Sequence, residues 1–379
     1  MDFSFTEEQQ ALRDLAAQIF ADKASVERIV EIERRTDDRI DRDLWAALAG
    51  AQLLGVAIPE HYGGLGFTML ELTFVLEQQG QFVAPVPLLP TLVLAAPAVA
   101  EFGTPTQQER WLRAVVQGNA VLTAAFAERG ANNVRRSSVR AEPVAGGWTL
   151  SGNKIAVPAA HVADAILVPA ETRGGLTVFI VDPKAPGVER IRYETTARDV
   201  QCSLELSNVF VGNDDVVGVV GQGAAIAAWS IDRADIAGAA IALGCCEKAL
   251  ALTAKYTSER EQFGRPLSTN QGVAIRAADA YIDIDCMRVT MWQAAWRLAE
   301  GLPARDEIDI AKYWAAEGGQ RVVHATQHLH GGMGADIDYP VHRYFLWVKQ
   351  LENMFGSGPQ QLARLGRSIA ASVTARSRA

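Results

Sequence analysis

The sequence predicts an α+β protein, mainly α, in which a small β domain lies between two helical parts. Helical periodicity of apolar residues fills the first third of the chain and returns, in longer segments, after about residue 221. Between them the pattern changes to short β-branched runs separated by Gly, Pro, Asn and Asp. We therefore expect an N-terminal α-helical domain over residues 1–120, a middle β domain over 121–220 and a C-terminal four-helix bundle over 221–379.

The first helix is predicted to begin after Thr6, whose hydroxyl can accept a hydrogen bond from a free amide of the first turn. Its expected buried face comprises Leu12, Leu15, Ile19 and Phe20. Two loops interrupt the helices that follow. They are the glycine-rich IPEHYGGLGFT and the proline-rich FVAPVPLLPT, in which prolines end one helix before the next begins.

Four runs in the middle third predict strands, because β-branched and aromatic residues favour the half-buried surface of a sheet. They are WTLSGNKIAV, AILVPAE, LTVFIVD and SLELSNVFV. Turn-forming residues separate them, so we expect a small antiparallel sheet.

Long amphipathic segments predict the C-terminal bundle. The first of them, AAWSIDRADIAGAAIALGCCEKALALTAKYTSER, runs without proline. The next two are NQGVAIRAADAYIDIDCMRVTMWQAAWRLAEG and RDEIDIAKYWAAEGGQRVVHATQHLHGG. A fourth helix is expected from Tyr344 to Ile369, which makes a four-helix bundle the natural packing.

Composition limits the possible partners and the compartment. The formal net charge of −8 gives no electrostatic footprint for nucleic acid. The start of the chain carries acidic residues where a signal peptide is basic, and we expect no apolar run of the roughly 18 residues that a membrane span needs. Four cysteines without CxxC spacing indicate reduced thiols: Cys202, Cys245, Cys246 and Cys286. A cytoplasmic protein with small-molecule or protein partners is expected.

The stretch SEREQFGRPLSTNQ places an arginine beside an aromatic residue at the end of a long helix. The guanidinium of Arg260 offers a planar pair of donors to a pyrophosphate, and the ring of Phe263 can cover another ring. Gln271 follows at the start of the next helix. The alternative interpretation is a solvated arginine at a helix end.

A second motif, QHLHGGMGADIDYP, places Gln327, His328 and His330 before the pair Gly331-Gly332. Because glycine has no Cβ, this pair allows a ligand or a backbone to approach closely. The alternative is an ordinary glycine cap of a helix. No carboxylate or cysteine joins the two histidines at a spacing suited to a metal, so we expect no metal site.

In content and order these pieces resemble the acyl-CoA dehydrogenases, and the resemblance covers essentially the whole chain. The most specific matches are SEREQFGRPLSTNQ and QHLHGGMGADIDYP, with support from PEHYGGLGF and YPVHRYF. The resemblance implies FAD-dependent α,β-dehydrogenation of an acyl-CoA thioester. In that reaction a carboxylate takes the α-proton, flavin N5 takes the β-hydride, and electron-transfer flavoprotein is the expected acceptor.

The resemblance also implies roles for individual residues. Those that would hold the pyrophosphate and adenosine of FAD are Arg260, Gln262, Phe263, Gln271, His328, Gly331 and Gly332. In the family these residues reach across a dimer interface and bind the ADP half of the FAD whose flavin ring lies in the neighbouring subunit. Asp232 and Arg233 lie where the family contacts the CoA arm of the substrate.

The chain departs from the family where the flavin ring is bound. A loop that resembles TEPGAGSD in the family reads AERGANN here, from Ala127 to Asn133. A strand that usually reads WIT has Ala156 and Pro158 in place of the Trp and the Thr, so an aromatic wall, a hydroxyl and an N–H group are missing. The alternative is sequence drift within a site that still works.

The catalytic base is also absent from both of its usual positions. Ala234 and Phe355 occupy them, and the nearest acids are Asp235 and Glu352. A shift of one residue along a helix turns a side chain by about 100°, so Asp235 would point elsewhere unless the helix is rotated. The alternative for either acid is a solvated or salt-bridged carboxylate.

These losses lead to one leading hypothesis and two rivals. We expect a subunit of an α2β2 acyl-CoA dehydrogenase that completes the FAD site of a catalytic partner, as in the actinobacterial heteromers that act on the acyl-CoA side chains of steroids. Lipid or steroid side-chain β-oxidation would be its setting. The first rival is a self-sufficient homotetrameric enzyme that uses Asp235 or Glu352. The second is a flavin-free scaffold that binds acyl-CoA.

Overall fold

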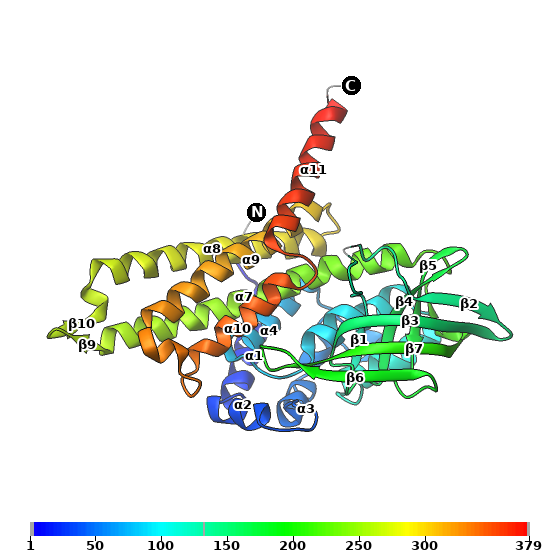
Figure 1. Cartoon of the computed structure of the whole chain (residues 1–379), viewed down its shortest axis with the longest axis horizontal. Coiled ribbons are helices and arrows are strands. Elements are labelled where there is room, and N and C mark those ends of the chain that lie inside the picture. The colour runs from blue at the N-terminus through cyan, green and yellow to red at the C-terminus, as the bar shows by residue number, and fades with distance from the viewer. Residues whose placement is uncertain (1–3, 132, 377–379) are drawn as a thin grey trace. The chain divides into compact units, whose positions relative to one another are not determined.

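The computed structural model describes residues 4–131 and 133–376, with side chains to residue 373 (Figure 1). These residues form two compact units. The first unit contains residues 4–29, 69–84 and 235–376, and the second contains residues 30–68 and 85–234, apart from residue 132. Helical, β and helical parts follow one another along the chain, as the sequence predicts. The boundaries at residues 120 and 220 stay a prediction.

Helices fill the first third of the chain. They are α1 (Glu7–Lys23), α2 (Val26–Glu33), α3 (Arg42–Gly50), η1 (Leu53–Gly55), η2 (Glu60–Tyr62), α4 (Met69–Phe82), the π-helix η3 (Leu89–Ala95), α5 (Ala96–Phe102) and α6 (Pro105–Val116). Pro90 lies at the start of η3, where the missing N–H group leaves no helical bond unmade.

The start of α1 confirms Thr6 as the N-cap. Its hydroxyl accepts a hydrogen bond from the amide of Gln9, and the Gln9 side chain accepts one in return from the amide of Thr6. The predicted buried face was partly wrong, because Leu15 is 40% exposed. Buried positions recur every four residues, at Leu12, Ala16 and Phe20, and Leu15 lies beside that ridge.

The second unit holds an eight-stranded sheet in the order β6-β7-β3-β2-β4-β5-β8, with β1 beside β4. Its strands are β1 (Leu122–Ala124), β2 (Arg140–Val144), β3 (Gly147–Pro158), β4 (Ala165–Thr172), β5 (Gly175–Val181), β6 (Val188–Glu194), β7 (Val200–Gly212) and β8 (Val216–Val217), with the short η4 (Asn213–Asp215) before β8. All four predicted strands are present. The sheet is not purely antiparallel, because β1 and β2 each pair with β4 in parallel. The side chains packed at its core include Leu150, Val157, Ile166, Val168, Phe179 and Val209.

Long helices return after the sheet. They are α7 (Gly223–Glu259), α8 (Gln271–Ala299), α9 (Arg305–Leu329), α10 (Val341–Asn353) and α11 (Gly358–Arg376). Short elements join them: the strands β9 (Glu261–Gln262) and β10 (Arg265–Pro266), then η5 (Leu267–Thr269) and η6 (Gly331–Ala335). The predicted helix from Tyr344 to Ile369 was wrong, because α10 and α11 are separate. Phe355 and Gly356 between them have φ of 58° and 127°, which no right-handed helix accommodates.

In the first unit α4 packs directly on α7. A Cβ on Gly80 would lie 2.0 Å from the carbonyl oxygen of Ile241, and one on Gly244 would lie 1.9 Å from that of Glu77. The two backbones approach this closely because both residues are glycine. A helix from the first third of the chain is therefore part of the same core as the C-terminal helices.

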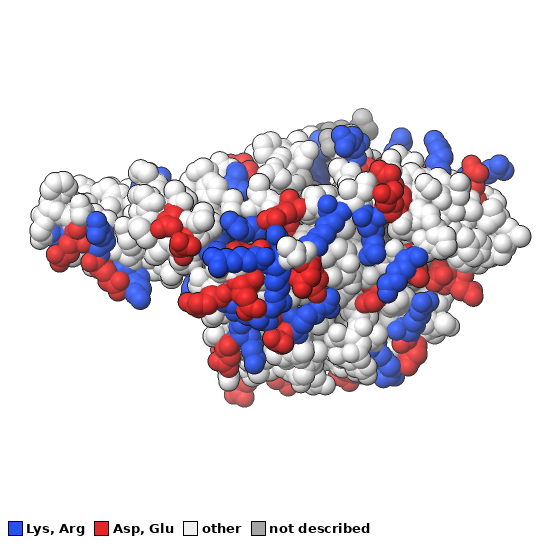
Figure 2. Space-filling model, turned by 60° about the horizontal axis from the view of Figure 1, so that its bottom comes forward, with Lys and Arg blue, Asp and Glu red and all other residues white. Residues whose placement is uncertain are grey.

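Among the described residues one helix, α7, is long and apolar enough to cross a membrane by length and composition. The expectation that no uninterrupted apolar run reaches about 18 residues is not contradicted, because Asp235, Glu247 and Lys248 interrupt the apolar residues of α7. Of its most apolar window, 72% is buried inside the protein, as in a helix of a protein core. On the face drawn in Figure 2, basic and acidic side chains are intermixed rather than separated into fields of one sign.

Candidate functional site

The motif around Arg260 forms an exposed hairpin after α7. Strands β9 and β10 pair across a two-residue turn, in which Phe263 and Gly264 have φ of 55° and 78°. Positive φ at both central residues is the geometry of the tightest hairpin turns. The ring of Phe263 is fully exposed at the tip, and Arg260 is exposed at the base of the hairpin. Both side chains are thus open to a molecule outside the chain.

The motif around Gly331 caps α9 with the turn η6. An added Cβ on Gly331 or Gly332 would meet no described atom within 4 Å, so the backbone of this pair is open on its outer side. At Gly334 an added Cβ would lie 2.3 Å from the carbonyl oxygen of Gln327. The side-chain amide of Gln327 donates a hydrogen bond to the carbonyl oxygen of Gly334. Internal packing thus requires glycine at 334, whereas the glycine pair leaves room for a ligand.

The structure brings these separate segments to one end of the bundle (Figure 1). Tyr256, one turn before Arg260 on α7, stacks on His330 at the end of α9 with ring centroids 4.6 Å apart. Arg276, in the second turn of α8, lies 3.0 Å from Nδ1 of His328. The end of α7, the start of α8 and the end of α9, which carry or adjoin the predicted FAD-binding residues, are therefore in contact at this end of the bundle.

His330 is buried at the centre of this end. Its Nδ1 lies 2.8 Å from the carbonyl oxygen of Thr326, which only a ring N–H can satisfy, so Nε2 accepts from the Tyr339 hydroxyl at 3.2 Å. Burial lowers the pKa of His330, which favours this neutral form. Sequence reasoning missed Tyr256 and Tyr339. The spacing of four residues between Tyr256 and Arg260 was the available signal.

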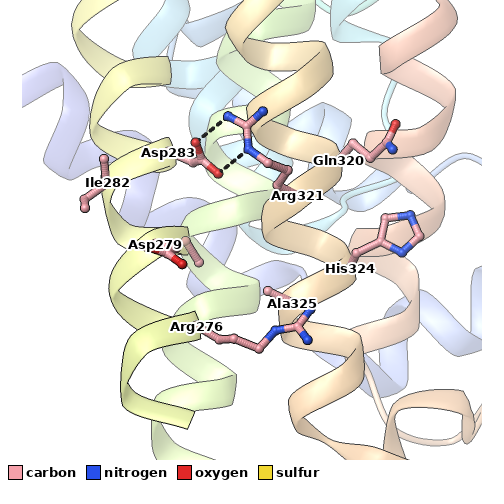
Figure 3. A pocket seen from close by; sticks show the side chains of 9 residues that line it. Arg276, Asp279, Ile282, Asp283, Gln320, Arg321, His324 and Ala325 are labelled. Carbon is pink, nitrogen blue, oxygen red and sulfur yellow. Dashed lines mark hydrogen bonds and ion pairs between the residues drawn. The ribbon is translucent and has the colours of Figure 1, made fainter. Parts of the chain in front are cut away.

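A groove of about 740 Å³ runs between α8 and α9 next to this end (Figure 3). Its lining residues are Arg276, Asp279, Ala280, Ile282, Asp283, Gln320, Arg321, His324 and Ala325. The guanidinium of Arg321 on α9 donates two hydrogen bonds to the Asp283 carboxylate on α8, at 2.9 and 2.5 Å. This bidentate pair fixes the spacing of the two helices.

In the second unit the loop AERGANN retains a buried ionic anchor. Residue 132 of this loop lies outside the described residues. Nζ of Lys154, on β3, lies 2.5 Å from the Glu128 carboxylate. The Ser137 hydroxyl and the Ser138 amide also donate to that carboxylate. Burial alone would raise the pKa of Glu128, but these hydrogen bonds lower it to about 2. The anchor of the loop is thus in place.

The two residues that the resemblance places at the ring-contacting positions are small or lack a donor. Ala156 is exposed on β3 with φ of 51°, at a point where the register with β7 shifts. Pro158 has no N–H group, and its carbonyl oxygen accepts from the Thr123 hydroxyl at 2.6 Å. These two residues give a flavin ring neither an aromatic wall nor a side-chain hydrogen bond.

The predicted CoA-contacting residues lie near the start of α7. The guanidinium of Arg233 lies over the Trp229 ring, 3.3 Å from its centroid, and donates to the Trp229 carbonyl oxygen. Burial lowers the pKa of Arg233 to about 10. Phe102 packs edge-on against the same indole. Arg233 is therefore fixed by packing, next to the half-buried Asp232.

The two candidate bases both lie near cations. The Asp235 carboxylate is buried, 3.6 Å from the Arg364 guanidinium and 3.9 Å from that of Arg305. The Glu352 carboxylate lies 2.5 Å from Nζ of Lys349. Such pairing favours a charge-balancing role over proton abstraction. The base role stays a prediction for both acids.

Ala234 is buried, and Phe355 is half-buried with positive φ. Neither side chain can take a proton. Among residues 4–131 and 133–376, no three His, Cys, Asp or Glu side chains gather in a way that could hold a metal ion.

Two family models match the chain. The model of the N-terminal domain of acyl-CoA dehydrogenases matches residues 6–119, and that of the C-terminal domain matches residues 221–370. Together they cover well over half of the sequence. The protein named acyl-CoA dehydrogenase FadE27, from Mycobacterium tuberculosis, is 41% identical over 98% of this chain and 99% of its own length.

Two solved structures are also similar to this chain in sequence and in fold. The steroid ACAD Tcur3481-Tcur3483, solved as a variant, contains a chain that is 46% identical, with a TM-score of 0.90 over 97% of this chain and 99% of that one. The ChsE4-ChsE5 complex from Mycobacterium tuberculosis contains one that is 41% identical, with a TM-score of 0.92 over 98% of this chain and 99% of that one.

Proposed function

The chain belongs to the acyl-CoA dehydrogenase family, whose members are FAD-dependent oxidoreductases, and we propose that it is the accessory subunit of a heteromeric member. In this proposal the end of its helical bundle completes the FAD site of a catalytic partner subunit. The partner supplies the flavin-ring pocket and the carboxylate that removes the substrate α-proton. The assembly is an α2β2 heterotetramer.

The observation that carries the proposal is an asymmetry between two sets of residues. The residues predicted to serve a neighbour's FAD are present and exposed, from Arg260 and Phe263 to Gly331-Gly332. The predicted set that would serve the chain's own flavin ring lacks an aromatic wall, a hydroxyl and an N–H group at Ala156 and Pro158, and no acid stands at either usual base position. An enzyme complete in itself would need both sets.

When bound, FAD supplies the acceptor for the β-hydride of the acyl-CoA. This chain's residues would then only bind and orient it. Arg260 would hold the pyrophosphate with its planar pair of donors, and Phe263 would cover the adenosine. Gln262, Gln271 and His328 would donate or accept hydrogen bonds at the same end, and the open backbone at Gly331-Gly332 would allow close approach.

The names of similar proteins suggest the substrate class. The solved structure Tcur3481-Tcur3483 is called a steroid ACAD and carries two names, and ChsE4-ChsE5 is called a complex. We therefore propose that the substrate is an acyl-CoA thioester formed on the side chain of a steroid or on another lipid. Asp232 and Arg233 would lie beside its CoA arm, electron-transfer flavoprotein would accept the electrons, and the cytosol is the proposed location.

The test uses a complex of this chain with a partner chosen by its sequence. A suitable partner is an acyl-CoA dehydrogenase of the same organism with the Trp and Thr that this chain lacks and a Glu at the position of Ala234 or Phe355. The chain purified alone should be colourless. The complex should be yellow, with about one FAD per pair of chains after denaturation.

Arg260→Ala in this chain should remove most FAD from the complex, because a pyrophosphate would lose its bidentate partner. Lys255→Ala is the matched control, since Lys255 is an exposed cation on the same end of α7. One FAD per chain in the isolated protein, with acyl-CoA-dependent dye reduction, would instead establish the self-sufficient enzyme. No change in FAD on Arg260→Ala in any complex would favour the flavin-free scaffold.

A further inference from the structure

Helix α11 carries an aliphatic row on its outer side. Leu362, Ile369 and Val373 are 47, 53 and 60% exposed. They are seven and four positions apart, so at about 100° per residue they lie within about 40° of one another around the helix. Leu365 borders the same side and is half-buried. A helix of a compact protein ordinarily buries such a row, so its exposure indicates a surface that another molecule covers.

The contacts of Arg364 hold the row outward. Its guanidinium lies 3.2 Å from the Asp309 carboxylate on α9 and 3.6 Å from the Asp235 carboxylate on α7. Arg364 lies about 200° around the helix from Leu362, so these ion pairs place the polar side of α11 against the bundle. Gln361, which is fully buried, is polar as well. Ion pairs and packing therefore set the rotation of this helix, and the aliphatic row is turned away from the other helices (Figure 1).

The end of the chain is basic although the chain as a whole is acidic. From residue 353 to residue 379 the sequence contains no Asp or Glu and four arginines, at 364, 367, 376 and 378, whereas the whole chain has a net charge of −8. Arg367 is exposed and lies about 140° around the helix from Leu362. An outward aliphatic row is thus combined with positive charge and with no negative charge.

An anionic lipid bilayer has the chemistry that fits both features. Its acyl region accepts aliphatic side chains, and its headgroups attract arginine. Helix α11 has 19 residues, interrupted by arginines, so it lacks the continuous apolar length of a membrane span and matches a helix that lies in the interface. A second copy of the chain fits less well, because two α11 helices paired along the row would bring like charges together.

We propose that α11 binds the surface of anionic membranes. Leu362, Ile369 and Val373 enter the boundary between headgroups and acyl chains, and Arg367 contacts the headgroups. This inference goes beyond the proposed function, because it requires neither FAD nor a partner subunit.

The test is co-sedimentation of the full-length chain with lipid vesicles. One set of vesicles consists of phosphatidylcholine alone, and in the other phosphatidylserine makes up about a third of the lipid. The unmodified chain should pellet with the second set and stay in the supernatant with the first. Raising the salt concentration should weaken the binding, because it screens the attraction between arginine and headgroup.

Two variants address the two features separately. Ile369→Glu places a carboxylate in the middle of the row, and Arg367→Glu reverses the charge beside it. Each should lower the partition coefficient by at least about tenfold. Both positions are exposed, so the fold should persist, which circular dichroism checks. Leu15→Glu on α1 and Arg140→Glu on β2 make the same chemical changes at exposed positions elsewhere and should bind like the unmodified chain.

The other outcomes overturn the proposal. It is wrong if the unmodified chain pellets with neither set, pellets equally with both, or is unaffected by Ile369→Glu and Arg367→Glu. If light scattering shows that Ile369→Glu separates two copies of a chain that binds no vesicles, the row is a contact between copies. If a co-expressed partner abolishes vesicle binding and Ile369→Glu releases that partner, the partner covers the row. The FAD content of Arg260→Ala complexes tests the proposed function independently of all these results.

Discussion

The imidazole of His330 stacks on the phenol ring of Tyr256, with an angle of 27° between the ring planes. The contact joins the last turn of α9 to the last turns of α7. It therefore joins the turn that carries Gly331-Gly332 to the end of α7 that precedes Arg260, although the two segments are far apart in the sequence. The rings form the support beneath the proposed nucleotide-binding residues, which themselves are exposed.

Replacing His330 should weaken that support. In His330→Ala the turn η6 loses the stack and the hydrogen bonds to Thr326 and Tyr339, at a cost of about 2–3 kcal/mol in the free energy of unfolding. Urea denaturation measures this. FAD in the partner complex should fall as well, because the turn is less fixed. His328→Ala, an exposed neighbour, should lower FAD with little effect on stability, and equal FAD loss without any stability change in His330→Ala would contradict a support role.

The same histidine predicts a dependence on acid. Burial lowers the pKa of His330 below 6.5. Just below pH 6.5 this histidine therefore binds a proton in the unfolded chain but stays neutral in the folded chain. Its contribution to stability is thus present above pH 6.5 and lost as the pH falls below that value. In His330→Gln, which cannot titrate, the fall in urea midpoint between pH 7 and pH 5 should be smaller than in the unmodified chain.

A buried acid at the junction of α1, α4, α7 and α8 predicts the opposite dependence. Burial and repulsion by Glu247 raise the pKa of Glu77 from 4.5 to about 7, although Arg13, the indole N–H of Trp292 and Arg288 oppose the rise. Between those pH values the folded chain holds an extra proton. Its stability should therefore fall by about 3 kcal/mol from pH 4.5 to pH 7 on account of this group.

Glu77→Gln keeps the shape of the side chain and removes the titration. The variant should be more stable than the unmodified chain at pH 8 and should not gain at pH 4.5, as measured by urea denaturation at both values. Glu60→Gln, on an exposed acid of the second unit, is the control that should leave the pH profile unchanged. A parallel shift of the whole curve in Glu77→Gln would show that packing, and not ionisation, is responsible.

The order of helices and strands along the chain was predictable, because long segments with regular apolar periodicity indicate their secondary structure directly. α7, α8 and α9 lie where the periodicity of the sequence predicts them, and the four β-branched runs lie in β3, β4, β5 and β7. A local signal also located Thr6 as a cap. Each of these depends on residues close together in the chain.

What failed depends on residues that are distant in sequence. The break after Asn353 is an exception, because Gly356, Gly358 and Pro359 were a local signal for it, although the positive φ at Phe355 was not indicated. The Tyr256–His330 stack joins two helices. The environment of Asp235 is set by Arg305 on α9 and Arg364 on α11. Departures from the family could be read from single positions, but their three-dimensional surroundings could not.

The buried pair Glu128–Lys154 predicts a large effect on the second unit. Lys154→Met leaves the Glu128 carboxylate buried without its cation, which should cost about 3–5 kcal/mol in unfolding free energy. Combining it with Glu128→Gln should recover part of that loss, because the lone charge is gone. Near-ultraviolet circular dichroism during urea denaturation measures both. Equal destabilisation by the double variant would indicate lost packing instead of an uncompensated charge.

The surroundings of Asp235 allow a direct decision between the two enzyme hypotheses. The Arg305 and Arg364 guanidinium groups and the buried Lys312 ammonium lie around its carboxylate. Burial lowers the pKa of Lys312, and Asp235 opposes this shift without cancelling it. Asp235→Asn removes one negative charge from this group of cations. We expect a loss of about 2–4 kcal/mol in unfolding free energy.

The turnover of the partner complex is then measured at saturating acyl-CoA, at a temperature where both the variant and the unmodified complex remain folded. The variant should stay within about twofold of the unmodified complex, because the substrate proton goes to the partner's carboxylate. Removal of a true base would lower turnover by roughly a hundredfold or more and would do so without any need for unfolding. Glu352→Gln is the matched variant at the other candidate position, where the Lys349 pair is partly exposed and a smaller loss of stability is expected. Because a structural carboxylate and a base differ in which of the two quantities they change, stability and turnover measured on the same preparation assign Asp235 to one role.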